Sequence, residues 1–331
     1  MRKRIITLGE VMMRFSIPGH ERFVQARNYD AEFSGAEANV AVSLAYWDQN
    51  VAHITAFPKN DLGKAAIQYL RPTGIDTSYI HMGAGRMGLY FLENGAMHRS
   101  SKIIYDRFDS AFSVYDGKEM DWQKIFEGVD WFHWTGITPA ISQTAAELCL
   151  DVIKAAKMNG VKISGDINYR RNLWQYGKSP LEIMPELISH THVIIAGLPD
   201  FANCMDIHES DFQMACQKAQ LMCPSIQMVA TTERVALSSS HNTLKGTLWN
   251  GEHLLFSKEY DMPNIVERVG GGDAFMAGLI YGLLDRTQQE ALEFGVAASV
   301  LKHSVPGDAN FVSVEEVDHL VKGENIGKLL R

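Results

Sequence analysis

The sequence predicts an α/β fold in which helices cover both faces of a mostly parallel sheet. Short apolar runs alternate with amphipathic stretches through the middle of the chain. The expected strands cover residues 130–134, 161–164, 192–195 and 227–230, and the expected helices between them cover 143–158, 181–189 and 211–222. Strands that alternate with helices of this length form βαβ units, which require a parallel sheet buried on both sides.

Two segments, 11–33 and 86–112, interrupt this alternation because both consist of extended chain without a helix. In the second segment, a strand at 89–92, a turn at 93–95 and a strand at 101–108 predict a hairpin. A chain of 331 residues fits one large α/β domain with an appendage or two modest domains. We expect a single domain over residues 1–331, with the two segments forming a small inserted β-sheet lid.

The composition is that of a globular protein with mixed surface charge. Hydrophobic residues make up 46% of the chain, which is enough for a sizeable core. The 31 basic and 39 acidic side chains give a net charge of -8, which argues against a nucleic-acid or membrane-surface binder. The four cysteines lack metal spacing, no signal-peptide core follows the basic N-terminus, and no apolar run could span a bilayer. We expect a soluble, cytoplasmic protein with reduced cysteines.

The run Gly270-Gly271-Gly272-Asp273 precedes an apolar helix that begins at Ala274. Consecutive glycines at the start of a helix expose backbone N–H groups at its positive end, and this arrangement suits a phosphate. Asp273 would then be placed to accept the proton of an attacking hydroxyl. The alternative is a tight turn in which Asp273 only caps the helix, and the glycine run alone favours that alternative.

Four further segments accompany the glycine run: Gly9-Glu10, 34–41 (SGAEANVA), 166–170 (DINYR) with Leu173-Trp174, and 302–304 (KHS) with 307–313 (GDANFVS). Together they resemble the ribokinase-like, or PfkB, family of carbohydrate kinases, and most of all its 2-keto-3-deoxygluconate kinase branch. The resemblance covers nearly the whole chain. It implies a ribokinase-like three-layer αβα sandwich with a small β-sheet lid. It also implies transfer of the γ-phosphoryl group of ATP, assisted by Mg²⁺, to a terminal hydroxyl of a sugar acid.

The resemblance also assigns roles to individual residues. Asp273 would be the base, and Gly270, Gly271 and Gly272 would form the anion hole. The expected substrate contacts are Gly35, Asn39, Tyr90, Tyr105, Arg107, Arg170 and Asp273. The expected nucleotide contacts are Asn168, Thr231, Arg234, Gly270, Gly272 and Asn310. The resemblance leaves open whether the chain binds a monovalent cation and whether it forms a homodimer through the lid.

The residue types fit a sugar acid. Tyr105 and Arg107 alternate along one expected strand and so share a face, where an aromatic ring and a guanidinium suit a sugar carboxylate. An ordinary exposed strand face is an equal alternative for this pair. Arg170 directly follows an expected strand, where ligand groups gather in open α/β sheets, although a surface arginine would show the same pattern.

Three departures from the family pattern keep other functions open. Residues 197–200 (GLPD) replace an Asn-x-x-Glu motif, so that Asp200 is the candidate Mg²⁺ ligand. Glu267-Arg268 replaces Asp-Thr, and 231–234 (TTER) replaces a glycine-containing nucleotide turn. The alternatives are a kinase for a neutral ketose such as fructose, which would offer the arginines no carboxylate, and a sugar or nucleotide sensor that has lost turnover. No GxGxxG follows the first strand, which disfavours a dinucleotide-binding oxidoreductase.

Overall fold

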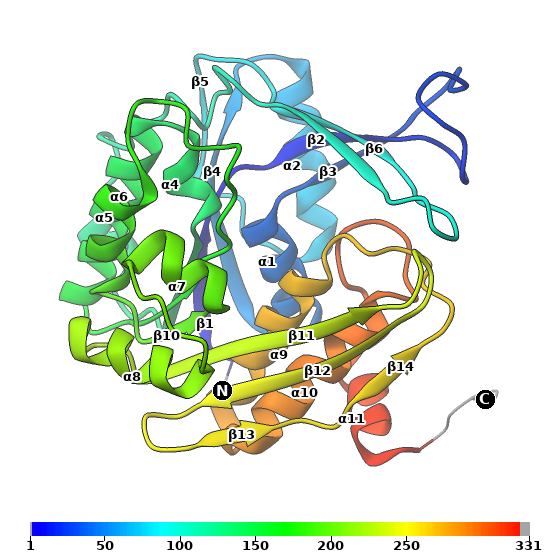
Figure 1. Ribbon diagram of the computed structural model, residues 1–331. Coiled ribbons are helices and arrows are strands. Elements are labelled where there is room, and N and C mark those ends of the chain that lie inside the picture. Colours follow the sequence, from blue (N-terminus) through cyan, green and yellow to red (C-terminus); the bar gives the residue numbers. More distant parts are fainter. Residues whose placement is uncertain (1, 325–331) are drawn as a thin grey trace.

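The main sheet of the molecule is mostly parallel and lies between two layers of helices (Figure 1). The computed structural model describes residues 2–324. Its main-sheet strands, in sequence order, are β1 (Arg4–Leu8), β4 (Asn50–Pro58), β5 (Ile80–Gly83), β8 (Trp131–Thr135), β9 (Lys162–Asp166), β10 (Val193–Ile195), β11 (Met228–Ala236), β12 (Asn242–Trp249), β13 (Leu254–Phe256) and β14 (Tyr260–Met262). The spatial order is β13-β12-β11-β10-β9-β8-β1-β4-β5, with β14 also paired to β12. The pairs from β5 to β11 are parallel, and the pairs that involve β12 are antiparallel.

The two helical layers bury two separate hydrophobic clusters against the sheet. One layer consists of α3 (Trp122–Ile125), α4 (Ile137–Ile141), α5 (Gln143–Met158), α6 (Pro180–Ile188), α7 (Leu198–Met205) and α8 (Phe212–Met222). The other consists of α1 (Ala36–Tyr46), α2 (Asp61–Leu70) with the short 3-10 helix Arg71–Thr73, α9 (Gly271–Asp285), α10 (Gln288–Lys302) and α11 (Val314–Lys322). Neighbouring residues of β1 enter opposite clusters, Ile5 one and Ile6 the other, as the period of two in a strand requires.

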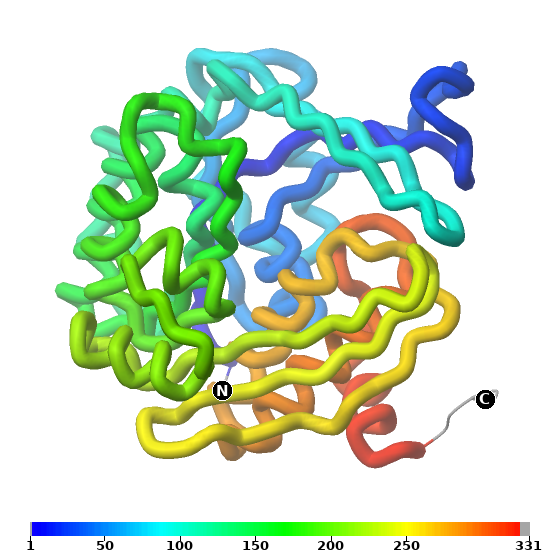
Figure 2. The backbone as a smooth tube through the Cα atoms, viewed as in Figure 1, coloured from blue at the N-terminus to red at the C-terminus, as the bar shows by residue number. Residues whose placement is uncertain are grey.

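A second, four-stranded sheet has the order β3-β2-β6-β7. Its strands are β2 (Met12–Ser16), β3 (Asp30–Ser34), β6 (Leu89–Glu93) and β7 (Lys102–Asp106). Figure 2 shows these blue and cyan strands reaching out above the yellow and orange segments that hold β11, β12 and α9. The small sheet therefore lies outside the main sheet and extends over the segments that contain β11, β12 and α9 (Figure 2).

The structure departs from the sequence expectations at three places. β11 continues to Ala236 because it pairs with β12 over eight residues in an antiparallel ribbon. Helix α7, which follows β10, was not expected. In the hairpin, the turn lies at Ala96–Arg99 and β7 ends at Asp106, since Glu93 stays in β6, where Arg99 binds its carboxylate. Within residues 2–324, no helix is both long and apolar enough to cross a membrane.

Candidate active site

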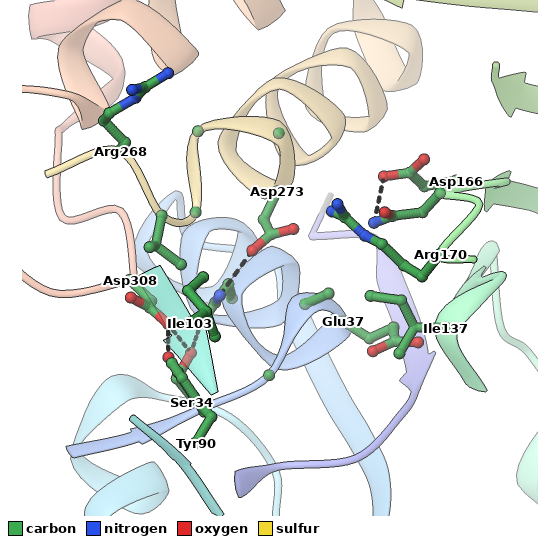
Figure 3. Close-up of a pocket in the computed structure, with 18 of the residues that line it drawn as sticks. Ser34, Glu37, Tyr90, Ile103, Ile137, Asp166, Arg170, Arg268, Asp273 and Asp308 are labelled. Carbon is green, nitrogen blue, oxygen red and sulfur yellow. Dashed lines mark hydrogen bonds between the residues drawn. The ribbon is translucent and has the colours of Figure 1, made fainter. Parts of the chain in front are cut away.

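A cavity of about 820 Å³ lies between the small sheet and the carboxyl ends of the parallel strands (Figure 3). The small sheet contributes Tyr90 and Tyr105, and the segments after β9 and β10 contribute Arg170 and Asp200. The first turn of α9 contributes Asp273. Ligands of open α/β sheets bind at this end of the strands.

Asp273 lies in the first turn of α9, and its side chain does not cap the helix. Its Oδ2 accepts a 2.7 Å hydrogen bond from Nδ2 of Asn39 in α1. Burial raises the pKa of Asp273 to about 7, and the bond from Asn39 opposes this rise. The helix-capping alternative is therefore wrong: Asp273 points into the cavity, and α1 holds it there.

The three glycines before Asp273 serve different purposes. Gly270 has a φ of 82°, and a Cβ at this position would lie 1.9 Å from the carbonyl oxygen of Asp308. A Cβ on Gly271 would lie 2.6 Å from the ring of His303, whereas one on Gly272 would meet nothing within 4 Å. Gly270 and Gly271 are thus required by backbone shape and packing, and Gly272 opens onto the cavity.

The first N–H groups of α9 are free to bind an anion. Ala274 makes the first helical hydrogen bond, to the carbonyl of Gly270. The N–H groups of Gly271, Gly272 and Asp273 have no hydrogen-bond partner among the residues that the structure describes. Unpaired donors at the positive end of a helix form an anion site.

The small sheet presents Tyr90, Tyr105 and Arg107 to the cavity. Tyr90 and Tyr105 are opposite each other in the β6–β7 pair, with ring centroids 5.9 Å apart. Arg107 follows β7 and lies over the Tyr105 ring, 5.9 Å from its centroid. Arg107 is buried, and its guanidinium is bound to Glu10 at 2.8 Å through Nε and 2.5 Å through Nη2. Nε and Nη2 of Arg107 therefore bind Glu10, and this ion pair fixes the guanidinium group at the cavity wall.

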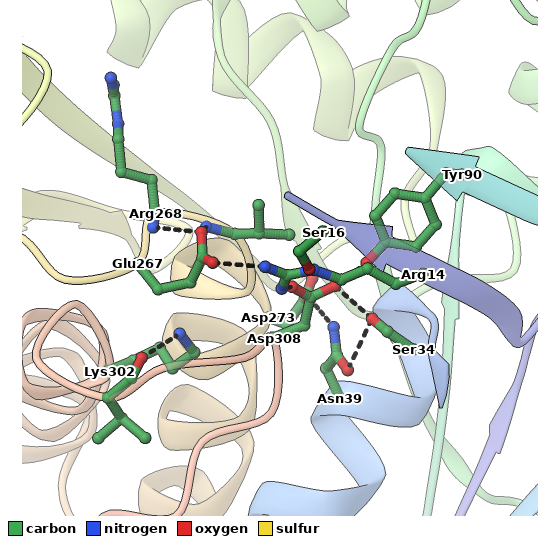
Figure 4. A network of polar contacts seen from close by, with 12 residues as sticks. Arg14, Ser16, Ser34, Asn39, Tyr90, Glu267, Arg268, Asp273, Lys302 and Asp308 are labelled. Atoms are coloured by element: carbon green, nitrogen blue, oxygen red, sulfur yellow. Dashed lines mark hydrogen bonds and ion pairs between the residues drawn. The ribbon is translucent and has the colours of Figure 1, made fainter. Parts of the chain in front are cut away.

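A buried network centred on Asp308 was missed by sequence reasoning (Figure 4). Arg14 of β2 binds Asp308 and, at 2.6 Å, Glu267, while the hydroxyls of Ser34 and Tyr90 donate to Asp308. Burial, followed by the charge of Asp308, raises the pKa of Tyr90 well above its usual value. The network connects the small sheet to the segment before α9, which contains Glu267, and to the segment after α10, which contains Asp308. The sequence contained one indication of this network: an arginine at a buried position of a strand requires an acidic partner.

Asn310, expected to contact the nucleotide, does not line the cavity. It is buried, and its Oδ1 accepts a 3.1 Å hydrogen bond from the N–H of Val312. Within the same motif, it is Asp308 that faces the cavity. The motif reaches the cavity through Asp308, because the side chain of Asn310 is buried against its own backbone turn.

Thr231 also lies outside the cavity wall. Its neighbour Thr232 lines the cavity, and so does Arg234, two residues further along β11. Thr231 faces the other side of the sheet edge, where its hydroxyl lies 3.8 Å from the position of a Cβ on Gly197. The alternation of side chains along a strand decides this difference.

Three arginines along the cavity have no hydrogen bond or ion pair from their side chains to the rest of residues 2–324: Arg170, Arg234 and Arg268. Arg170 points toward Asp273 from the side of Asp166, and Arg268 lies on the opposite side of Asp273 (Figure 3). Burial and the nearby charge of Arg268 lower the pKa of Arg234. Several guanidinium groups without a hydrogen-bonded partner around one cavity favour a polyanionic ligand.

Asp166 and Asp200 form an acidic wall beside Asn168, which also lines the cavity. Asp200 lies in the first turn of α7, and its carboxylate accepts from the N–H groups of Gly197 at 2.7 Å and Tyr169 at 3.0 Å. Burial, followed by the charges of Asp200 and Asp273, raises the pKa of Asp166 to about 8. Gly197 thus needs no side chain to hold Asp200 in place.

This acidic wall fits Mg²⁺. Carboxylate oxygens are the ligands this ion prefers, and a bound cation would favour the ionised form of Asp166. No three His, Cys, Asp or Glu side chains within residues 2–324 are grouped closely enough to hold a metal by themselves. Mg²⁺ commonly uses one or two carboxylates together with water and substrate phosphates, as this wall would require.

Glu37 is a further acid that the sequence analysis did not single out. It is buried at the cavity wall, and its Oε1 accepts from Thr135 at 2.7 Å and Thr138 at 2.9 Å. Burial raises the pKa of Glu37, while these hydroxyl donors oppose the rise. Glu37 fixes the first turn of α1, from which Asn39 reaches Asp273.

A buried carboxylate in the first turn of a helix, next to free N–H donors, suits phosphoryl transfer to a hydroxyl group. The profile of the pfkB family carbohydrate kinases matches residues 2–315. The chain belongs to this family and is an ATP-dependent carbohydrate kinase.

Individual relatives align over almost the full length of the chain. A 2-dehydro-3-deoxygalactonokinase of Haloferax volcanii is 28% identical, covering 99% of this chain and 99% of the relative. A 2-dehydro-3-deoxygluconokinase of Bacillus subtilis is 25% identical, covering 98% of this chain and 100% of the relative. The crystal structure of a 2-dehydro-3-deoxygluconokinase of Thermotoga maritima has a TM-score of 0.92 and 36% identity, covering 97% of this chain and 100% of that one. The ribokinase-like fold expected from the sequence is confirmed.

Proposed function

We propose that this kinase phosphorylates a 2-keto-3-deoxy sugar acid, with 2-keto-3-deoxygluconate as the first candidate and its 6-phosphate as the product. The observation that carries the proposal is that two guanidinium groups, those of Arg107 and Arg170, line the same cavity as Asp273. A neutral sugar would offer these groups no carboxylate. The names of the relatives that match over full length support the same class of substrate.

In the proposed reaction, the terminal hydroxyl oxygen of the sugar forms a bond to the γ-phosphorus of ATP. The bond between that phosphorus and the β–γ bridging oxygen breaks, ADP leaves, and Oδ1 of Asp273 takes the hydroxyl proton. Asn39 holds the other carboxylate oxygen, so that the base keeps its orientation. The N–H groups of Gly271, Gly272 and Asp273 stabilise charge on the transferred group.

The phosphate chain of ATP needs further positive charge in this scheme. Arg234 and Arg268 would contact the phosphates, since neither has another partner among the described residues. Mg²⁺ held beside Asp166 and Asp200 would neutralise phosphate charge during the transfer. Asn168 would contact the nucleotide from the same wall.

A screen with Mg-ATP and a coupled assay of ADP release tests the proposal. We expect the two 2-keto-3-deoxy acids, the gluconate and the galactonate, to exceed fructose in kcat/KM by about 100-fold. Fructose offers no carboxylate to Arg170, whose side chain has no hydrogen-bonded partner among the described residues, or to the donors of Arg107 that do not bind Glu10. The galactonate is included because one relative carries its name. A preference for fructose would reject the sugar-acid assignment, and sugar binding without ADP release would support the sensor alternative.

We also propose that two copies of the chain form a homodimer through the small sheet. Phe15, Phe91 and Ile104 are cross-strand neighbours on the face opposite Tyr90 and Tyr105, and Ile104 is 54% exposed. A second copy of this chain would cover this apolar row. Light scattering should then report a dimer for the wild type and a monomer for Ile104→Glu.

We also infer a cytoplasmic location. The four cysteines are free and buried, as in proteins kept in a reducing compartment.

A further inference from the structure

Lys302 is a fully buried lysine with no part in the proposed chemistry. It is the last residue of α10, its exposed fraction is 0%, and its Nζ donates a 3.2 Å hydrogen bond to the carbonyl of Val305 (Figure 4). Burying an ammonium group is costly unless nearby groups compensate its charge. A lysine in this position therefore requires a reason.

The surroundings of Lys302 supply that compensation. Glu267, Asp308 and Asp273 attract the ammonium and Arg14 repels it, while burial lowers its pKa. The carbonyl ends of α10 add negative potential, because Lys302 lies in the last turn of this helix. The ammonium group therefore lies in a carbonyl- and carboxylate-rich environment that opposes the effect of burial.

The Lys302 side chain also packs against the start of the glycine run. Its Cε lies 3.2 Å from the position that a Cβ on Gly270 would take. The carbonyl oxygen of Asp308 lies 1.9 Å from the same Cβ position. Residues 303–308 form the turn that joins Lys302 to Asp308. Lys302 thus lies beside Gly270 and is hydrogen-bonded to the turn that packs on it.

We propose that the Lys302 ammonium is a built-in monovalent cation of the phosphate-binding turn, which keeps residues 303–308 packed on Gly270 and makes the kinase independent of added K⁺ or NH₄⁺. The inference rests on the proposed kinase function. Lys302 is a positioning residue in this role: it holds Gly270, and Gly270 sets the direction of the free N–H groups of Gly271 and Gly272. On this proposal no bound monovalent ion is needed, because the protein supplies the charge itself.

Titration of the wild-type enzyme with KCl, against choline chloride at equal ionic strength, is the first test. We expect kcat and KM for ATP to change by less than about twofold, because the ammonium already fills the position. Activation by K⁺ of about fivefold or more would overturn the proposal. This measurement requires no variant and so does not depend on how the variants fold.

Two variants then test the charge itself. Lys302→Met keeps most of the packing volume and removes the charge, and we expect it to lower kcat about 10- to 100-fold, as loss of positioning does. Lys302→Ala leaves space, so NH₄⁺ or K⁺ should restore its activity about fivefold or more, while choline should not. A folded Lys302→Met with wild-type kcat, or a folded Lys302→Ala that neither ion restores, would contradict the proposal.

Lys322→Met is the matched control, because Lys322 is also the last residue of a helix but is exposed and does not line the cavity. It should match the wild type in every salt. Thermal unfolding of each variant, with and without NH₄⁺, identifies any that fail to fold. If no sugar acid is phosphorylated, the sugar-acid proposal fails separately, and ATP binding by calorimetry in the same salts still tests Lys302.

Discussion

The two ends of the cavity differ in how their charges are satisfied. At the small sheet, Arg14 and Arg107 are buried and bound to Asp308, Glu267 and Glu10. At the other end, the side chains of Arg170, Arg234 and Arg268 have no such partner among the described residues. The first end is organised by the protein's own ion pairs, whereas the second depends on a ligand for its charge balance. Asp273 lies where the two ends meet.

Asp273→Asn should produce the largest effect, because it removes the group on which both ends converge. We expect kcat to fall about 10²- to 10⁴-fold, since an amide cannot accept the hydroxyl proton. The amide keeps the shape of the side chain and its bond from Asn39, so calorimetry should still detect binding of the sugar acid. A variant that keeps more than about a tenth of wild-type kcat would show that another group is the base.

Replacing one arginine at each end tests the comparison directly. Arg107→Met leaves Glu10 buried and unpaired, so we expect a loss of about 3 kcal/mol or more in the free energy of unfolding. Arg170→Met should leave this free energy unchanged and raise KM for the sugar acid about 10-fold or more, because a charged hydrogen bond to substrate is lost. Urea unfolding and steady-state kinetics of both variants provide the measurements. Equal destabilisation by the two variants would remove the distinction.

The double variant Arg107→Met with Glu10→Gln is the control for the first of these effects. It removes both charges of the pair, and we expect it to recover part of the stability that Arg107→Met loses.

Arg268→Thr replaces the guanidinium group before the glycine run by a small uncharged side chain. We expect KM for ATP to rise about 5- to 10-fold without loss of stability, because a partnerless guanidinium contributes to binding rather than to folding. The exposed Arg27, which does not line the cavity, provides the control as Arg27→Ala. An unchanged KM for ATP would place the phosphates away from Arg268.

The pH dependence should show the smallest effects. The ordinary pKa of an aspartate is 3.8, whereas that of Asp273 is raised to about 7 and that of Asp166 to about 8. Between the ordinary pKa and the raised pKa, each of these carboxyl groups binds more protons in the folded state than in the unfolded state. The contribution of these groups to the free energy of unfolding therefore falls as pH rises from about 4 to about 8. Asp166→Asn should accordingly raise Tm at about pH 8 and leave it nearly unchanged at about pH 4.

The activity should follow the ionisation of the same base. We expect kcat/KM of the wild type to rise with pH up to about 7, as Asp273 loses its proton. A flat profile across this range would show that proton uptake by Asp273 does not limit the reaction.

Much of the site could be predicted because its residues are adjacent in the chain. Gly270 to Asp273 lie on consecutive positions, and the small sheet was expected from the extended segments that contain Tyr90 and Tyr105. The Asp308 network could not be predicted in the same way, since Arg14 is 294 residues from Asp308 and 253 from Glu267. Sequence spacing carries no information on which distant charges meet.

The sequence by itself determined the class of fold and the helix start with its free N–H groups, and it singled out Asp273 as the proposed base. These features depend on local patterns: apolar periodicity, glycine backbone freedom and the fixed direction of helical N–H groups. Only the tertiary structure decided that Asp308 rather than Asn310 faces the cavity, that Thr232 rather than Thr231 lines it, and that Lys302 lies under Gly270. These choices depend on which segments pack together, because burial and the partners of each charge arise only when strands and helices from distant parts of the chain meet.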